Sequence, residues 1–574
     1  MPRLRPLLLL SVFVMSAPAH AAWLHLCPQA GAPSRPPFAD TIAEDGARLR
    51  WLVDEQPERA GCTGIALPPG ARIETLFPLA PQEEIERTVL LHGRVRDGRF
   101  AVSEHLLPSS RPGTPKPGPM PLRANLLPHM QARAYGVEER VRVSLDKGRL
   151  TVECDAGARP AGVLLSGPWF LPRARLRLAA AYAGDAGFSL AASDAARAAR
   201  ESPLALGALP ARASARPAAQ AAADAEPLRL TLPEALDRPG WRNFVLQCPA
   251  QAAGITLQRL VLEPDPAPAL RPPARATWVW KAADWREHGA GLLDWAAAHG
   301  VRELFITVPF KNEAVQEPAR LAAFVRSAGA RGIRVLSVDG DPHMVLPESL
   351  PALSRLVRAY VAYNAAAEPG ARLAGLQFDV EPYLLQEYGA GQVDWDGRYL
   401  AMARTLRQAA GSLRLEFVLP FWWDGKTALL DGLAPLADAL VVMDYRTDPA
   451  EVSEFAIPFL DWGARHGKQV RIALEAGPVA AETQRRYVRA ETGDTAGLLR
   501  LRIKGQQVLA LLREPVANTP GIEAFHLQST REIDGSATTF HRDKAALLRV
   551  LPGLEADFGA WDGAFAGMAL HELR

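Results

Sequence analysis

The segment Gly375–Leu385 reads GLQFDVEPYLL and places two acids, Asp379 and Glu381, at the end of a short apolar run. A strand buried on both faces is normally a continuous run of Val, Ile and Leu. Two carboxylates at the end of such a run indicate a strand whose last residues leave the core. Residues two apart on a strand point to the same side, about 6–7 Å apart. Asp379 and Glu381 are therefore predicted to face one opening.

Similar apolar runs recur after Arg275 and alternate with amphipathic stretches of helix length, several of which end in Gly. Eight strands that alternate with helices predict an α/β fold, a (β/α)8 barrel over residues 276–574. A doubly wound open sheet is the alternative, but no G-x-G-x-x-G loop follows the first run. The eight runs begin at Ala276, Glu303, Ile333, Gly375, Leu413, Ala439, Gln469 and Ile522.

The part before the barrel carries shorter runs in which polar and apolar residues alternate, as in half-exposed strands. We expect a β-rich region at residues 22–137, a β-sandwich at 138–263 and a stiff Pro-rich linker at 264–275. The Ala/Arg/Pro/Ser tract 195–225 is expected to form no core. The closing stretch GWRNFVLQCPAQAAGITLQRLVLEP resembles the last strands of carbohydrate-binding jelly-roll modules, and a purely structural sandwich is the alternative.

The first 21 residues, MPRLRPLLLLSVFVMSAPAHA, have the parts of a secretory signal peptide. Arg3 and Arg5 precede the apolar run Leu7–Met15, and Ala19–Ala21 forms a small-x-small cleavage site. The apolar run is too short to span a membrane, and no later run of about 18 apolar residues suggests an anchor. We therefore expect cleavage after residue 21 and a periplasmic or secreted protein without a membrane span.

The four cysteines and the charge balance further limit the classes of protein to which this chain can belong. An even number of cysteines in an exported chain predicts disulfides, and Cys27–Cys62 with Cys154–Cys248 is favoured among the three possible pairings. Metal binding is the weaker interpretation, because no pair has C-x2-C spacing. The 65 Lys and Arg residues nearly balance the 63 Asp and Glu residues, which argues against a nucleic-acid-binding protein.

In a (β/α)8 barrel, chemistry takes place where the strands end. Two neighbouring carboxylates repel each other, which raises one pKa, as general acid catalysis near neutral pH requires. Acids that act on a glycosidic bond, beside aromatic rings that stack on sugars, indicate a glycoside hydrolase. We predict Glu381 as the general acid, Asp379 and Glu475 as its catalytic partners, a carbohydrate substrate, and no cofactor or metal. The predicted substrate-binding residues are Tyr383, Tyr445, Arg446, Trp280, Trp423 and Asp339.

The segment GLQFDVEPY resembles the strand-four motif D-x-D-x-E of family 18 glycoside hydrolases, the chitinases and endo-β-N-acetylglucosaminidases. VVMDY resembles their strand-six M-x-Y, with Tyr445 as the match. The resemblance implies that Glu381 is the proton donor and that Asp379 orients an acetamido group of the substrate. Gln377 stands where the first Asp of the motif belongs, which puts that acetamido-assisted mechanism in question.

A second resemblance is to retaining glycosidases, in which the acid/base Glu ends strand four as N-E-P and the nucleophile Glu ends strand seven. VEP at Val380–Pro382 and ALEAG around Glu475 are similar, with Val380 in place of Asn. Glu475 would then attack the sugar, or activate water in an inverting reaction, depending on its distance from Glu381. Pairing of Arg446 with Glu475 would keep that nucleophile ionised.

The alternative from another class is a glycan-binding barrel without catalysis, in a system of polysaccharide export or assembly. The two departures from the family motifs, Gln377 and Val380, favour it.

Overall fold

The computed structural model divides into two compact units. Unit 1 comprises Met1–Pro112, Gln386–Val393 and Ala481–Ile533, and unit 2 comprises Gly113–Leu385, Asp394–Ala480 and Asp534–Arg574. The structure describes residues 22–28, 39–42, 48–54, 60, 62–79, 85–96, 99–107, 118–167, 169–172, 174–194, 203–212, 226–232, 240–265, 274–385, 393–491, 493–503, 506–561 and 563–574. The predicted signal peptide, residues 1–21, and most of the 264–275 linker lie outside these ranges.

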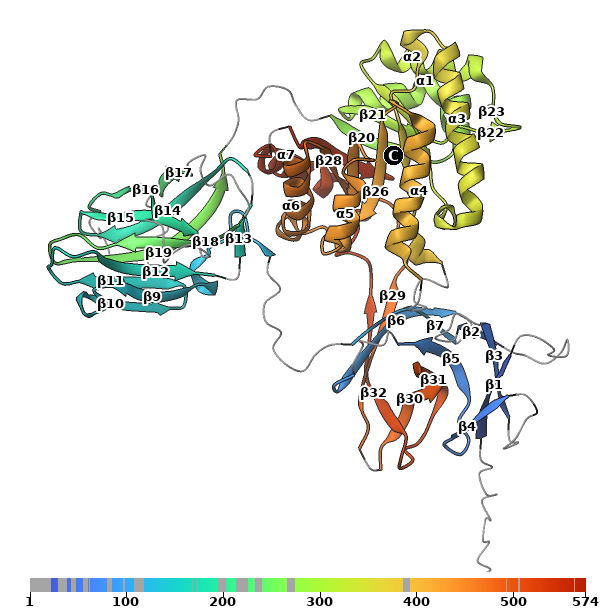
Figure 1. Ribbon diagram of the computed structural model, residues 1–574, viewed down its shortest axis with the longest axis horizontal. Coiled ribbons are helices and arrows are strands. Elements are labelled where there is room, and N and C mark those ends of the chain that lie inside the picture. Colours follow the sequence, from blue (N-terminus) through green and yellow to red (C-terminus); the bar gives the residue numbers. More distant parts are fainter. Residues whose placement is uncertain are drawn as a thin grey trace, which may run out of the picture. The chain divides into compact units, whose positions relative to one another are not determined.

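Unit 2 contains a closed barrel of eight parallel strands, so the predicted barrel fold is confirmed (Figure 1). Each strand is buried on both sides, inside by the barrel core and outside by helices, and this explains the continuous apolar runs. In chain order the barrel elements are β20 (Arg275–Val279), α1 (Ala282–Ala298), β21 (Val301–Ile306), α2 (Pro318–Gly329), β24 (Arg334–Asp339), α3 (Leu350–Ala366), β25 (Leu376–Phe378), α4 (Trp395–Ala410), β26 (Leu415–Pro420), α5 (Thr427–Leu433), β27 (Ala439–Met443), α6 (Pro449–His466), β28 (Gln469–Glu475), α7 (Lys544–Phe558) and β33 (Phe565–His571).

The prediction of the eighth barrel strand was wrong. The run at Ile522 forms β32 (Glu523–Ile533), which pairs antiparallel with β29 (Glu482–Arg489) and β30 (Thr495–Ile503) in unit 1. The barrel is closed instead by β33, which pairs with β28 and β20. The predicted barrel range 276–574 is thus interrupted by Ala481–Ile533, an insertion that belongs to unit 1.

The barrel interior is mostly apolar, but its amino-terminal half also holds buried charges. Gln377 is the inward residue of β25 and links Trp278 to Glu416, with N···O distances of 2.6 and 3.2 Å. Arg471 of β28 pairs with Glu303 of β21, and both side chains are buried. The apolar side chains inside are Ala276, Trp278, Phe305, Leu336, Val338, Val418, Val441, Met443, Ala473 and Ala569.

Unit 2 also contains a β-sandwich. One sheet has the order β10-β11-β19-β14-β17, and the other has the path β16-β15-β18-β12-β9. The tract 195–225 was expected to form no core, but part of it forms β16 (Leu204–Leu209), and Leu209 is fully buried. The remaining bounds are β9 (Gln131–Gly136), β10 (Val141–Asp146), β11 (Arg149–Cys154), β12 (Ala161–Ser166), β14 (Leu176–Gly184), β15 (Phe188–Asp194), β17 (Leu228–Thr231), β18 (Gly240–Gln247) and β19 (Ala253–Pro264).

A disulfide joins the two sheets of the sandwich. Cys154 ends β11 and Cys248 follows β18, with 6.0 Å between their Cα atoms, so this predicted pairing is confirmed. Cys62 is also disulfide-bonded. The side chain of Cys27 lies outside the described part of the chain, and its pairing with Cys62 stays a prediction.

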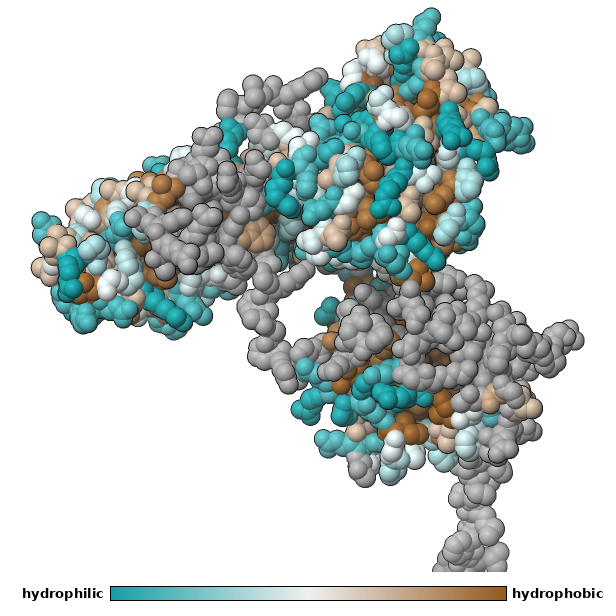
Figure 2. Space-filling model, in the orientation of Figure 1, coloured by the Kyte–Doolittle hydropathy of each residue, from teal (hydrophilic) through white to brown (hydrophobic). Residues whose placement is uncertain are grey.

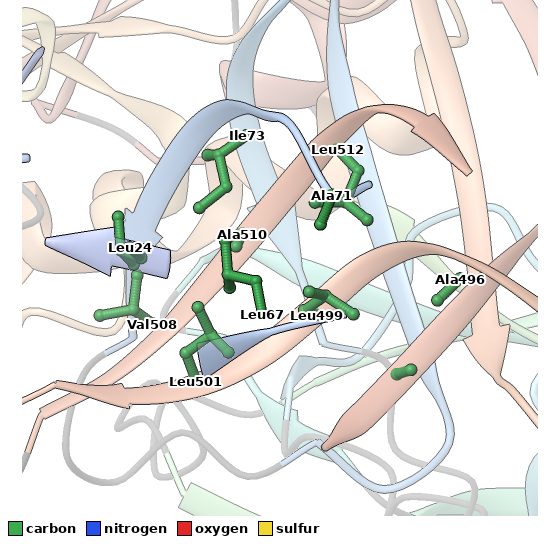
Figure 3. Close-up of a cluster of buried hydrophobic side chains, with 11 residues drawn as sticks. Leu24, Leu67, Ala71, Ile73, Ala496, Leu499, Leu501, Val508, Ala510 and Leu512 are labelled. Atoms are coloured by element: carbon green, nitrogen blue, oxygen red, sulfur yellow. The ribbon is translucent and has the colours of Figure 1, made fainter. Parts of the chain in front are cut away.

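Unit 1 combines the N-terminal strands with the strands of the insertion. Its larger sheet has the order β5-β31-β30-β32-β29-β6-β7, and a four-stranded sheet has the order β2-β3-β1-β4. A core cluster joins Leu24 and Leu67 to Leu499, Val508 and other side chains of the insertion (Figure 3). The bounds are β1 (Ala22–Pro28), β2 (Ala39–Ile42), β3 (Arg48–Asp54), β4 (Thr63–Leu67), β5 (Ile73–Pro78), β6 (Thr88–Arg96), β7 (Arg99–Leu106) and β31 (Gln506–Ala517).

The outer surface of the barrel is mixed in character. Figure 2 shows hydrophilic residues interspersed with hydrophobic ones over its helices. Among the described residues, no helix has the length and apolarity needed to cross a bilayer.

Candidate active site

The acids of strand four face the carboxyl end of the barrel. Asp379 and Glu381 follow β25 and continue the phase of its inward residue, Gln377. Side chains in the inward phase also end or follow four other strands. We call this group the mouth; its members are Trp280 after β20, Asp379 and Glu381 after β25, Tyr445 after β27, Glu475 at the end of β28 and His571 at the end of β33.

Electrostatic interactions show that these mouth side chains lie near one another. Burial raises the pKa of Tyr445, and the charges of Glu475, Asp379 and Glu381 raise it further. The ring of Tyr445 also stacks on that of His571, with 6.1 Å between centroids and 13° between planes. Residues from strands four, six, seven and eight therefore converge, as the sequence predicted for Asp379, Glu381, Tyr445 and Glu475.

Asp379 is half-buried, and its carboxyl group has one buried, unsatisfied oxygen. Burial raises its pKa to about 7, the neighbouring Glu381 charge adds to this, and His571 opposes it. Its Oδ1 atom is buried and has no hydrogen-bond partner among the described residues. A carboxyl oxygen of this kind is free to take a hydrogen bond from a ligand.

Glu381 also holds its proton more tightly than an ordinary glutamate. Burial raises its pKa, against the opposing effects of a hydrogen bond from Tyr383 and the charge of His571. The Tyr383 hydroxyl donates to Glu381 Oε2, and this contact fixes the orientation of the carboxyl group. Two adjacent carboxyls with raised pKa values can keep a proton available near neutral pH.

Glu475 is held by two N–H donors. Its Oε1 accepts from the Gly477 backbone at 2.6 Å, and its Oε2 lies 2.7 Å from His571 Nδ1. Arg446 does not pair with it, so that predicted pair was wrong. Instead the Arg446 guanidinium donates to the Tyr445 carbonyl at 2.8 Å and lies over the Phe421 ring.

Two further predicted site residues are not members of the mouth. Leu336 and Val338 are the inward residues of β24, so Asp339 faces outward, where it accepts a hydrogen bond of 2.9 Å from the Tyr360 hydroxyl of α3. Trp423 is only 2% exposed, and its ring packs at 5.3 Å against Tyr399 of α4 and at 6.3 Å against Tyr383. Both side chains contact a helix of the barrel, Asp339 through Tyr360 of α3 and Trp423 through Tyr399 of α4.

The exposed rings near the mouth are Trp280 and Trp422. Trp280 is 37% exposed and Trp422 is 53% exposed. The Trp422 ring contacts Tyr383 edge-to-face at 5.4 Å, so it lies beside the tyrosine that orients Glu381. Trp423 contacts Tyr383 as well, and of the two neighbouring indoles Trp422 is the exposed one.

The sequence analysis also missed His571 as a residue of the mouth. The run FAGMALH, Phe565–His571, is short and follows the amphipathic stretch Lys544–Phe558, the same strand-after-helix order as in the rest of the barrel. Counting the last such run as strand eight would have placed His571 at a strand end.

Among the described residues, no cluster of three or more His, Cys, Asp or Glu side chains is arranged to hold a metal ion.

Similar folds occur among solved structures. The spore cortex-lytic enzyme SleL of Bacillus cereus is 10% identical, covering 55% of this chain and 73% of its own, with a TM-score of 0.30. The class V chitinase of Nicotiana tobaccum is 9% identical over 52% of this chain and 93% of its own, with a TM-score of 0.29. The catalytic domain 2 of the Ostrinia furnacalis group II chitinase, solved with a chitooligosaccharide, is 11% identical over 52% and 89%, with a TM-score of 0.27.

In each case the similarity extends over about half of this chain, at 9–11% identity. No protein-family profile matches the chain. No curated protein sequence matches it either.

Proposed function

We propose that this protein is an exported glycoside hydrolase that cleaves a polysaccharide or oligosaccharide, with Glu381 as general acid. The observation that carries the proposal is the pair Asp379 and Glu381, two half-buried carboxyls in the barrel mouth whose pKa values are both raised. An acid that keeps its proton near neutral pH can protonate the leaving oxygen of a glycosidic bond.

The second catalytic role falls to Asp379 more readily than to Glu475. Both oxygens of Glu475 already accept hydrogen bonds, from Gly477 and His571. Asp379 Oδ1 has no partner in the described part of the chain. We therefore propose that Asp379 assists at the anomeric carbon or orients a substrate group there. Glu475 would have a structural role in the mouth and would not react with the sugar.

The aromatic rings supply the sugar contacts. Trp280 and Trp422 are the exposed rings near the acids, and aromatic faces of this kind stack on pyranose rings. Tyr383 bonds to Glu381, and Tyr445 stacks on His571, so both phenol rings adjoin the titratable groups of the mouth. The N-terminal segment 1–21, with its signal-peptide pattern, supports a periplasmic or secreted location, where envelope or extracellular glycans are available.

The test compares Glu381→Gln with Glu368→Gln, an identical change at an exposed residue on the connection from α3 to β25. Both variants and the parent chain are incubated with a panel of bacterial glycans, and new reducing ends are measured. We expect the parent and Glu368→Gln to release reducing ends equally and Glu381→Gln to lose at least about 100-fold, since general acid catalysis contributes on the order of 10²–10⁴. Cleavage by Glu381→Gln at the parental rate would remove Glu381 from this role.

A glycan-binding barrel without catalysis is the second candidate, and Gln377 favours it. Both ends of its amide are engaged, by Trp278 and Glu416, and residue 377 itself supplies no acid below Asp379. Binding of a glycan in a pull-down, with no new reducing ends from the parent chain on that same glycan, would support this candidate over hydrolysis.

A further inference from the structure

His571 contacts two functional side chains at once, through opposite ring nitrogens. Its Nδ1 lies 2.7 Å from Glu475 Oε2, and its Nε2 lies 3.1 Å from the indole nitrogen of Trp280. An indole N–H is a donor only, so Nε2 must be the acceptor in the second contact. The proton of the neutral imidazole then sits on Nδ1, where it is donated to the Glu475 carboxylate.

The ring is also fixed from its faces and edges. It stacks on Tyr445 at 6.1 Å, and Trp278 meets it edge-on at 5.6 Å. A ring packed between these two aromatic side chains cannot rotate to exchange its partners without disturbing both. Its position therefore determines where the Trp280 indole and the Glu475 carboxylate lie.

Trp280 is the exposed member of this arrangement, and it borders a cavity. A hollow of about 370 Å³ lies beside β20 and α1, and its wall includes Trp280, Trp278 and Trp295 with Asp284 and Glu572. This volume falls within the range of small-ligand pockets, about 300–1,000 Å³. A sugar residue bound there would stack on an indole whose orientation is set by His571.

We propose that His571 is the positioning residue of the mouth: in its neutral Nδ1–H form it fixes both the Glu475 carboxylate and the Trp280 ring, which forms the wall of an adjoining sugar subsite. Protonation places a hydrogen on Nε2, so that two N–H donors face each other and the Trp280 contact is lost. The sugar subsite rests on the proposed glycoside hydrolase function, whereas the hydrogen-bond arrangement does not.

The charged and titratable groups around His571 come from four strands. Glu475 of β28 bonds to it, and Glu572 follows it directly after the end of β33. Asp379 and Glu381 face it from the end of β25, and Tyr445 faces it from the end of β27. Burial lowers the pKa of His571, but the hydrogen bond and charge of Glu475, joined by Glu572 and Asp379, leave it raised. The switch between the two forms thus falls at or above the usual range of histidine.

The test needs no substrate. The full chain is labelled with 5-fluorotryptophan, and its ¹⁹F resonances are followed from pH 5 to pH 9, with Trp280 assigned through Trp280→Phe. We expect the Trp280 resonance to move with a single midpoint, while Trp285, whose indole donates to a backbone carbonyl, serves as an internal reference that does not move. In His571→Gln, which keeps polar atoms but cannot titrate in this range, the Trp280 resonance should become independent of pH.

Two further variants separate His571 from its neighbours. In Asp379→Asn the Trp280 titration should persist, because it does not arise from that carboxyl. In Glu475→Gln the midpoint should fall by about 1 pH unit, because the charge that favours imidazolium is gone. A Trp280 resonance that does not titrate, or titrates in His571→Gln as in the parent, overturns the proposal, and so does a titration that disappears in Asp379→Asn.

Discussion

The indole N–H of Trp278 lies 2.6 Å from the amide oxygen of Gln377. The amide N–H of the same glutamine donates to Glu416 at 3.2 Å, and all three side chains are buried. A neutral amide is the group that can accept from one side and donate to the other, which a carboxylate cannot do. This explains in physical terms why glutamine stands where the family motif has an aspartate.

Replacing Gln377 by glutamate should destabilise the barrel. The new carboxylate would face Glu416 with no donor between them, and an uncompensated buried charge costs about 3–5 kcal/mol. We expect the free energy of unfolding of Gln377→Glu to fall by about that amount at pH 8. The loss should shrink as the pH falls, because the introduced carboxyl takes up a proton and regains a donor. Urea denaturation at pH 8 and pH 5 measures both effects.

Gln408→Glu, the same change at an exposed position of α4, is the control and should leave the unfolding free energy unchanged. Equal stability of Gln377→Glu and the parent at pH 8 would contradict the bridging role of the amide.

Asp379 and Asp339 should affect the pH dependence of the unfolding free energy in the same way. Burial raises the pKa of each to about 7, well above that of an unfolded aspartate. Between about pH 4 and pH 7 the folded chain therefore holds protons that the unfolded chain releases, so stability falls as the pH rises through this window. We expect Asp379→Asn and Asp339→Asn to flatten that slope and to gain about 1–3 kcal/mol at pH 8 in urea denaturation.

The two variants should differ in activity. Asp379 faces the mouth, whereas Asp339 faces Tyr360 of α3. Asp379→Asn is expected to lose glycan hydrolysis by on the order of 10²-fold or more, and Asp339→Asn to retain it. Parental activity in Asp379→Asn, or an equal loss in both variants, would contradict this prediction. It would show that hydrolysis does not depend on whether the aspartate faces the mouth.

The barrel could be predicted because its strands lie between a core and a layer of helices. Burial on both faces gives apolar runs that stand out from the helices, and seven of the eight strands lie where their runs indicated. The eighth failed because β32, in an antiparallel sheet of unit 1, carries a run of similar length and composition. Sequence pattern records local burial, and it does not record which sheet a strand joins.

The errors at single site residues have a simpler origin. The inward phase of β24 contains Val338, so Asp339 must point outward, and this parity was available in the sequence. The sequence could not show which of Trp422 and Trp423 is exposed. Both lie at the 3₁₀ turn Phe421–Trp423 after β26, where side-chain direction no longer alternates. Tertiary packing against Tyr399 decides which ring is buried.

The sandwich disulfide offers a prediction that is independent of the mouth. Cys154 and Cys248 are 94 residues apart in the chain and join the two sheets. Removal of a native disulfide of this kind typically costs about 2–5 kcal/mol. We expect Cys154→Ser/Cys248→Ser to unfold its sandwich at lower temperature by calorimetry and the barrel transition to move less. Reductant should bring the parent's sandwich transition to that of the double variant, and an unchanged transition in both cases would contradict a stabilising disulfide.

Trp422 and Trp423 should separate binding from stability. Trp423 is 2% exposed, and removing a buried tryptophan side chain costs about 3–5 kcal/mol, so Trp423→Ala should lower the unfolding free energy by that amount. Trp422 is 53% exposed beside Tyr383, and its loss should leave stability within about 1 kcal/mol. We expect Trp422→Ala to weaken glycan binding by about 10-fold, from the loss of one stacking surface. Urea denaturation and isothermal titration with an oligosaccharide that the parent binds measure the two effects. Weakened binding in Trp423→Ala alone, with Trp422→Ala unchanged, would place the sugar contact on the buried side and overturn this assignment.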